Sequence, residues 1–210
     1  PTITLDNQGA TTAGTETVEA TYGEDLQTIT VPTKTGYTFG GYYTGTNGSG
    51  TQYYFDDGTG VMRSDFEVAT TLYAKWTVNT YTVTLNQQSA TTDGTKSVNV
   101  NYGSAMPSIT LPKRTGYTFG GFYTSTSGSG TKYYNANGSS ARTYTLTSTT
   151  TLYAYWTKDT YTITYNNNGG TINTTPTTSY QYGNSVTLPD DVTRDGCTFG
   201  GWFDNANCEG

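Results

Sequence analysis

Histidine, the side chain that most often acts as a general base near neutral pH, does not occur among the 210 residues of this sequence. Histidine-based catalytic triads and histidine-ligated metal sites are therefore excluded. The sequence also lacks the G-x-S-x-G pattern of a nucleophilic serine and the G-x-x-x-x-G-K-[ST] pattern of a phosphate-binding loop. We predict that the chain is not an enzyme and binds neither a cofactor nor a metal.

Adjacent carboxylates are the next candidates for chemistry, since paired acidic side chains can exchange protons or bind Ca²⁺. Three such pairs occur, at Glu24-Asp25, Asp56-Asp57 and Asp190-Asp191. A calcium loop needs several oxygen ligands in a spacing such as D-x-[DN]-x-[DN]-G, which the run ending at Gly58 and the run from Asp204 to Asn207 match poorly. We interpret these side chains as solvated turn charges.

Pairs of adjacent aromatic residues could instead bind a partner. They occur at Tyr42-Tyr43, Tyr53-Tyr54, Phe122-Tyr123 and Tyr133-Tyr134. Successive side chains of a strand point to opposite faces, so we expect one member of each pair to face outward. The candidate binding surface for sugars or a protein consists of Tyr43, Tyr54, Tyr123, Tyr134 and Trp202. The alternative, which the pattern favours, is ordinary strand-surface tyrosines that pair across strands.

The elements that would position these side chains recur every 80 residues. The string GYTFGG begins at Gly36 and Gly116, and GCTFGG begins at Gly196. Common solenoid repeats run about 20 to 50 residues, so this period is better explained by a small autonomous domain. The period divides the chain into repeat one (1–76), a linker (77–80), repeat two (81–156), a linker (157–160) and an incomplete repeat three (161–210).

The patterned stretches are rich in threonine and tyrosine, which favour strands. They predict a mainly β fold, α+β at most, with little helix. In repeat one we expect strands at 2–5, 17–22, 37–43, 51–55 and 70–76, and one short helical turn at Glu24–Gln27. In the last strand, Leu72, Ala74 and Trp76 should share one face, and Tyr73 and Lys75 the other.

The linkers contain neither glycine nor proline and could continue the strands on both sides, which predicts a stiff array. Repeat three stops at Gly210, which aligns with Gly50, and so lacks its fourth and last strands. A small sheet without its closing strand exposes an open edge. We expect either that the chain was cut from a longer protein or that something else fills this edge.

The two cysteines, Cys197 and Cys208, both lie in repeat three. By alignment they replace Tyr37 and Gly48 of repeat one. Two such replacements in one copy favour a disulfide over two free thiols in a secreted protein. The bond would join the third strand to the turn after it.

Several landmarks in fixed order resemble the Listeria–Bacteroides repeat, also called the internalin B-type B-repeat. They are Tyr161–Thr164, Asn168–Gly170, Tyr182-Gly183, Arg194, Gly201-Trp202 and Thr71–Trp76. The resemblance covers the whole chain, although Tyr42 and Phe122 stand where the family usually has tryptophan. It implies a compact β-grasp-like, ubiquitin-like module, arrayed in surface adhesins and other secreted proteins, with a stalk or binding role.

The net charge of −6 argues against nucleic-acid binding, which needs a basic face. The sequence has no apolar run of 18 residues, so we expect no membrane insertion. We predict a non-catalytic stalk or spacer of an extracellular, bacterial cell-surface protein, with a host or cell-surface protein or glycan as candidate partner. The alternatives are a carbohydrate-binding array and a self-associating fibre in which repeat three accepts a strand from a neighbour.

Overall fold

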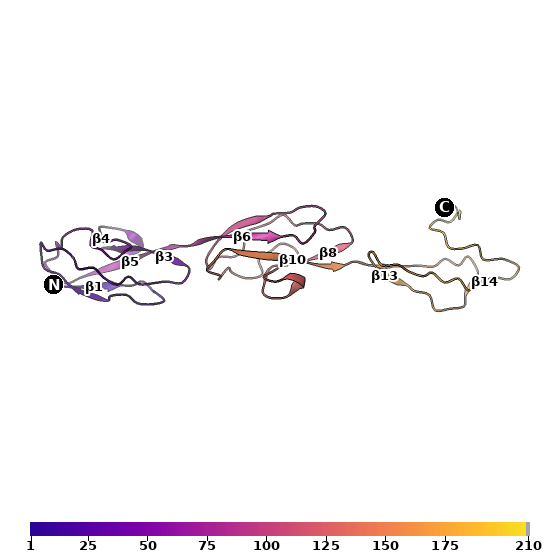
Figure 1. The fold of residues 1–210 in the computed structure, drawn as a ribbon, viewed down its shortest axis with the longest axis horizontal. Coiled ribbons are helices and arrows are strands. Elements are labelled where there is room, and N and C mark those ends of the chain that lie inside the picture. The colour runs from indigo at the N-terminus through magenta and orange to yellow at the C-terminus, as the bar shows by residue number, and fades with distance from the viewer. Residues whose placement is uncertain (209–210) are drawn as a thin grey trace.

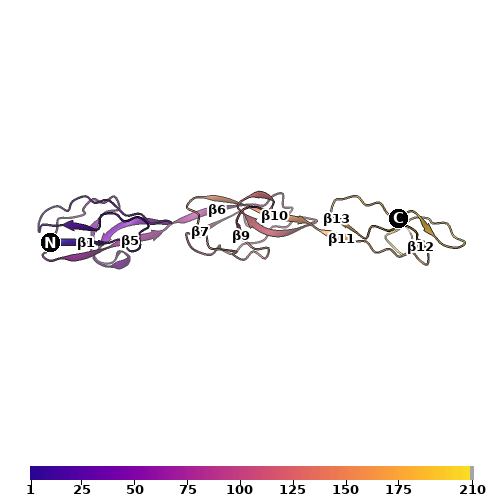
Figure 2. The same ribbon diagram turned by 90° about the horizontal axis from the view of Figure 1, so that it is seen from below.

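The computed structural model describes residues 1–208, so the last two residues of the expected third repeat lie outside it. The chain forms three lobes that follow one another along a single long axis (Figure 1). The same arrangement is seen after a quarter turn about that axis (Figure 2). Within the described residues no helix has the length and apolar character needed to span a membrane.

The first lobe is a five-stranded sheet. Its strands are β1 (Thr2–Asp6), β2 (Thr17–Glu19), β3 (Tyr37–Tyr43), β4 (Gln52–Tyr54) and β5 (Thr70–Val78). Across the sheet they lie in the order β2-β1-β5-β3-β4. The central pair, β1 and β5, is parallel, and the other neighbours are antiparallel. The first and last strands of the repeat are therefore hydrogen-bonded neighbours.

The second lobe repeats this plan. Its strands are β6 (Thr80–Asn86), β7 (Ser97–Asn101), β8 (Tyr117–Tyr123), β9 (Lys132–Tyr134) and β10 (Thr150–Lys158), in the order β7-β6-β10-β8-β9. Among residues 1–208 the helical elements are two single 3₁₀ turns, η1 (Thr46–Gly48) and η2 (Thr126–Gly128). The predicted mainly β fold is confirmed. The β-grasp detail stays a prediction.

The helical turn expected at Glu24–Gln27 is wrong. Asp25 forms a β-bridge with Arg63, and their side chains make an ion pair of 3.3 Å. The neighbouring Leu26 is buried in the core. This segment is therefore held extended by contacts with a distant loop, which a local helical preference does not outweigh.

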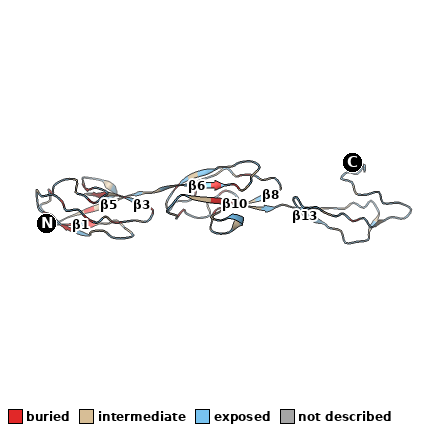
Figure 3. Cartoon of the chain, viewed as in Figure 1, coloured by how far each residue is buried: buried red, intermediate tan, exposed pale blue. Residues whose placement is uncertain are grey.

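The core of each complete repeat is thin and rich in aromatic rings. Its buried residues lie along the strands of the first two lobes (Figure 3). In repeat one, Leu72 and Ala74 of β5 are buried and Trp76 packs against them, whereas Tyr73 and Lys75 are half-exposed. The expected alternation of β5 is confirmed. Burying a large ring removes more apolar surface from water than an aliphatic side chain does, so few residues close the core.

Repeat three forms much less β-sheet than the two complete repeats. It contains β11 (Thr160–Thr162), β12 (Thr171–Ile172), β13 (Ser179–Gln181) and β14 (Val192–Thr193), paired only as β11-β13 and β12-β14. Residues 197–203, which align with β3, form no strand. Phe199 is 36% exposed, whereas its counterpart Phe39 is 8% exposed. The lobe therefore has no closed core.

The strand order corrects one expectation about repeat three. Two strands were expected to be missing, the counterparts of β4 and β5. The first would be an edge strand, but β5, the closing strand, lies in the middle of its sheet and not at an edge. In repeat one, β5 joins β1 on one side to β3 on the other. Without such a strand, β11 and residues 197–203 have no common neighbour to pair with. This explains why an intact GCTFGG string forms no strand.

Candidate functional site

The structure contradicts part of the predicted aromatic surface. Tyr54 and Tyr134 were expected to face outward, but both side chains are fully buried. The Tyr54 ring packs on Tyr42 at 6.2 Å between centroids, and the Tyr134 ring packs on Phe122 at 6.0 Å. These two tyrosines belong to the cores and are not available to a ligand.

Their strand neighbours are buried as well, for a reason that alternation along a strand cannot reveal. Tyr53 and Tyr133 point away from Tyr54 and Tyr134, yet they are only 4% and 2% exposed. The loop between β4 and β5 covers the Tyr53 ring with Phe66, at 4.4 Å between centroids. Both faces of this short strand are therefore enclosed, one by the sheet core and one by the loop.

Tyr43, Tyr123 and Trp202 keep part of their surface in solvent. The amino group of Lys75 lies 5.7 Å from the Tyr43 ring, and that of Lys132 lies 5.5 Å from the Tyr123 ring. Cations over a ring face are favourable contacts, so these faces are already in use within the repeat. A binding role for the three residues stays a prediction.

The joint between the first two lobes is a more highly organised site. Only Asn79 separates β5 from β6, so the linker is nearly all strand, as expected. The Asn79 amide donates to the Gly36 carbonyl (2.9 Å), and the Tyr102 amide donates to the Asn79 carbonyl (2.9 Å). The Asn79 side chain accepts a further hydrogen bond, of 2.6 Å, from the Thr38 hydroxyl. One linker residue thus bonds to both repeats.

Tyr102 of repeat two completes this joint by packing on repeat one. Its ring lies against the bare backbone of Gly36, where a Cβ atom would be 2.1 Å from the ring. It also meets the Tyr37 ring edge-on, at 6.2 Å between centroids. Gly36 has a φ of +78°, which glycine adopts without strain. The Gly36-Tyr37 step is therefore shaped to accept a tyrosine from the next repeat.

The second joint repeats the first, contact by contact. Asp159 takes the place of Asn79, with an amide bond of 3.0 Å to the Gly116 carbonyl and a 2.6 Å bond from the Thr118 hydroxyl. The Tyr182 ring lies where a Cβ at Gly116 would be 2.0 Å away, and it meets the Tyr117 ring at 5.9 Å. Because the same contacts occur at both joints, we interpret them as a specific interface between consecutive repeats.

Comparison with known families now identifies the unit. The model of the Listeria-Bacteroides repeat domain matches residues 2–75, 81–155 and 161–210. The chain belongs to the Listeria-Bacteroides repeat family. The resemblance read from the sequence is thereby confirmed over all three copies, and the linker residues Asn79 and Asp159 lie between the matched segments.

Curated relatives carry the same repeats within longer chains. A protein of Evansella cellulosilytica, provisionally named a membrane protein, is 28% identical over 191 residues, which are 89% of this chain and 25% of the relative. Internalin H of Listeria monocytogenes is 36% identical over 136 residues, 65% of this chain and 22% of the relative. The chain thus spans a quarter or less of either protein. No solved structure gives a significant match.

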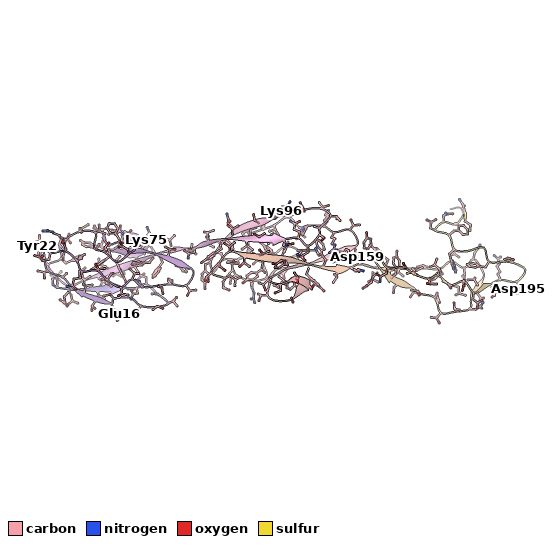
Figure 4. All side chains as sticks on the ribbon, viewed as in Figure 1. Glu16, Tyr22, Lys75, Lys96, Asp159 and Asp195 are labelled. Carbon is pink, nitrogen blue, oxygen red and sulfur yellow. The ribbon has the colours of Figure 1, made fainter. Side chains whose placement is uncertain are left out.

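Two further positions of the joint motif make no joint contact among the described residues. Tyr22, the counterpart of Tyr102 and Tyr182, is 62% exposed and lies at the far end of the first lobe (Figure 4). Gly196, the counterpart of Gly36 and Gly116, has no atom within 4 Å of where its Cβ would be. These two positions are the natural controls for any test of the joints.

The tyrosines at the end of β4 and of β9 differ in one hydrogen bond. The Tyr134 hydroxyl donates to the Pro107 carbonyl at 2.8 Å. Tyr54 holds the same place in the first repeat, but its buried hydroxyl has no hydrogen-bond partner. A buried polar group without a partner costs about 1–3 kcal/mol.

We therefore expect opposite effects from the same substitution in two repeats. Tyr54→Phe removes an unsatisfied hydroxyl and should leave repeat one as stable or more stable. Tyr134→Phe removes a formed hydrogen bond and should destabilise repeat two by about 1 kcal/mol. Urea denaturation followed by NMR signals of each repeat measures both. Equal destabilisation by the two substitutions would contradict this assignment.

Burial also controls the ionisation of these phenols. It raises the pKa of Tyr54 and of Tyr134 to about 12, from an ordinary 10.0. For Tyr53, burial and then the hydrogen bond to Asp65 raise the pKa to about 12. The folded state thus favours the protonated phenols. The stability that this preference contributes is complete below pH 10 and is lost as the pH rises from 10 toward 12.

An alkaline titration followed by phenolate absorbance and circular dichroism tests this preference. The phenols of Tyr53, Tyr54 and Tyr134 should ionise only near pH 12, together with the loss of folded structure. A single ionisation near pH 10, with the fold still intact, would show that the rings of β4 and β9 are accessible.

The two cysteines are free and exposed in the structure. The predicted disulfide between Cys197 and Cys208 is therefore absent from it, although both residues line the same open hollow of repeat three. In repeat one, Lys75 of β5 packs between the matching turn and β3, against Gly40 and Gly48. Repeat three has no such strand to hold the turn against residues 197–203.

The three acidic pairs are exposed, but only Asp56-Asp57 lies in a turn, as expected; Asp25 forms a β-bridge, and Asp190-Asp191 lies outside any turn. Asp57 accepts hydrogen bonds from the hydroxyl (2.6 Å) and amide (2.9 Å) of Thr59, which lower the pKa of its carboxyl group. Asp25 pairs with Arg63, and Asp191 accepts from the Asn173 amide. Among residues 1–208 no three His, Cys, Asp or Glu side chains gather as metal ligands would.

Proposed function

We propose that this array of Listeria-Bacteroides repeats is a non-catalytic spacer on an extracellular, bacterial surface protein, in which each complete repeat is a domain of its own. The observation that carries the proposal is the joint that occurs twice with the same contacts. A flexible tether needs no specific contacts between its units. A spacer that holds its two ends apart needs each unit fixed to the next.

The chemistry of the joints supports a stiff connection. Each linker is strand except for one residue, Asn79 or Asp159, and that residue is bonded to the repeats on both sides. Each joint adds one aromatic pair, which contributes about 0.5–1.5 kcal/mol. Bending a joint therefore breaks several hydrogen bonds and one ring contact together.

Small-angle scattering tests the spacer proposal. The wild-type chain should give the maximum dimension of a straight rod of three lobes. The double variant Tyr102→Ala, Tyr182→Ala removes both joint rings and should give a shorter and broader distribution of dimensions. Tyr22→Ala removes the matching tyrosine that forms no joint and should leave the distribution unchanged.

Two outcomes would overturn the proposal. One is a wild-type particle that is compact or strongly bent. The other is a double variant with the wild-type dimensions, which would mean that the tyrosines do not hold the repeats in line.

An adhesive role is a second candidate, with the half-exposed rings of Tyr43 and Tyr123 as its surface. The observation that favours it is that both rings hold the same place in consecutive repeats, each beneath a lysine. Regular spacing lets weak contacts to a glycan or a surface protein add together. A glycan or host-protein array in which Tyr43→Ala and Tyr123→Ala leave every signal unchanged would eliminate this surface.

The third candidate is a fibre in which repeat three accepts a strand from a neighbouring copy. It is favoured by the absence of strand pairing at residues 198–203 and by the exposed rings of Phe199 and Phe203. Such a strand would take the central position that β5 and β10 hold in the other repeats. Mass measurement by light scattering at high concentration decides: a strict monomer removes this candidate.

A further inference from the structure

The path of the chain through each complete repeat has a mechanical consequence. The chain enters repeat one through β1 and leaves through β5, and these strands are parallel neighbours. Their register runs from Ile3 opposite Thr70 to Asp6 opposite Tyr73. A pull on the start of β1 and on the end of β5 therefore drives the two strands past each other along their length.

The direction of the pull decides how the ladder responds. When two parallel strands slide past each other, the load falls on all the hydrogen bonds between them at once. When a hairpin is opened from its free end, the bonds break one after another, each under the full load. The same number of hydrogen bonds thus resists sliding much better than peeling.

We infer that repeats one and two resist tension along the chain, with the β1–β5 and β6–β10 ladders as the resisting elements. This inference rests on the proposed spacer function, since a spacer between a surface and a partner is pulled from its two ends. Both complete repeats have the same geometry: β6 pairs with β10 from Val83 opposite Thr150 to Asn86 opposite Tyr153. Figure 1 shows that the chain passes from lobe to lobe along the direction of these strands.

A side-chain hydrogen bond reinforces each ladder. The indole N–H of Trp76, near the end of β5, donates to the carbonyl of Asn7, just after β1 (2.9 Å). Trp156 makes the same bond to Gln87 (2.9 Å). Each bond joins the outgoing strand to the segment that follows the incoming strand, so it is loaded when the two strands begin to slide.

Repeat three provides an internal reference. Its described residues contain β11, paired only with β13, and no parallel partner for β11. Residues 161–208 should therefore extend under a load that the other two repeats withstand. One molecule thus contains two repeats with the central ladder and one without it.

Single-molecule pulling on the full chain, with handles at its two ends, tests the inference. We expect two abrupt unfolding events, each releasing about 3.5 Å for every residue of one repeat. Repeat three should extend before them at no more than about half their force, because it lacks the sheared ladder. Events of equal, low force for all three repeats would overturn the inference.

A change of pulling direction gives a control that does not depend on any destabilising substitution. In a background of Cys197→Ser and Cys208→Ser, handles on Thr80→Cys and Lys158→Cys load the β6–β10 ladder by sliding. Handles on Thr80→Cys and Asn101→Cys, which are register partners, peel β7 from β6. The first geometry should need at least about twice the force of the second. Equal forces would sink the inference.

The tryptophan hydrogen bond has its own test in the full chain. Trp156→Phe keeps a ring in the core but removes the bond to Gln87, so repeat two should yield at a lower force while repeat one keeps its own. Weak repeats in a particle that scattering shows to be straight would overturn this inference and leave the spacer function standing. Strong repeats in a bent particle would do the reverse.

Discussion

Gly116→Ala should open the second joint, whereas Gly196→Ala should change only its own turn. Both glycines have positive φ, at +72° and +69°, so alanine costs about 1–2 kcal/mol of backbone strain at either position. At Gly116 the new methyl group would lie 2.0 Å from the Tyr182 ring, although carbon atoms pack best at about 3.5–4.0 Å. The ring must move away, and the Tyr117–Tyr182 contact goes with it.

The measurement is the NMR cross-peaks between the rings of Tyr117 and Tyr182, together with the particle dimensions. Gly116→Ala should abolish the cross-peaks and broaden the distribution of dimensions. Gly196→Ala introduces the same backbone strain, but no ring lies near its methyl group. It therefore separates the effect of backbone strain from that of the steric clash with Tyr182. Cross-peaks that survive in Gly116→Ala would mean that Tyr182 does not depend on the bare glycine.

The joint explains why two dipeptides recur so regularly in this sequence. Tyr102-Gly103 and Gly116-Tyr117 look like ordinary strand and turn residues when one repeat is considered alone. Their role is in the contact between repeats. The tyrosine of a Tyr-Gly dipeptide covers the glycine of the Gly-Tyr dipeptide in the preceding repeat, as Tyr102 covers Gly36. The signal was present in the sequence as a fixed offset, but only the structure shows which copy contacts which.

Sequence reasoning succeeded where the pattern is local. The period of 80 residues, the strand character of the threonine-rich stretches and the faces of β5 all follow from side-chain order along one strand. The near continuity of the linkers with the strands also followed, because residues 77–80 contain neither glycine nor proline. These features need no knowledge of what lies across the sheet.

It failed where burial comes from a distant segment. Alternation correctly places Tyr53 and Tyr54 on opposite sides of β4, but it cannot show that the loop carrying Phe66 returns to cover the outer side. Likewise, the sequence of one strand does not reveal the position of that strand in the sheet. The sequence therefore could not show that the closing strand of a repeat, such as β5, belongs at the centre of the sheet.

Substitutions at the aligned positions 122 and 202 should differ most in their effect on stability, because the strand that repeat three lacks is the central one. Phe122 is fully buried beside Phe119 and Tyr134, with β10 paired to its strand. Phe122→Ala should cost repeat two about 3–5 kcal/mol. That is a large part of the 5–15 kcal/mol that stabilises an ordinary domain, so the protection of repeat two against hydrogen exchange should fall sharply.

Trp202 occupies the aligned position in repeat three, yet its ring is half-exposed. It packs against the rings of Tyr165 and Phe199, and its indole N–H donates to the Pro189 carbonyl. Trp202→Ala should therefore produce no cooperative loss of structure. Residue-resolved hydrogen exchange measures both variants, with repeat one as the unchanged reference in each. A loss of protection in Trp202→Ala as large as that in Phe122→Ala would mean that repeat three closes a core without a central strand. Protection lost only in the mutated repeat of Phe122→Ala would show that the repeats fold as separate units, joined but not fused.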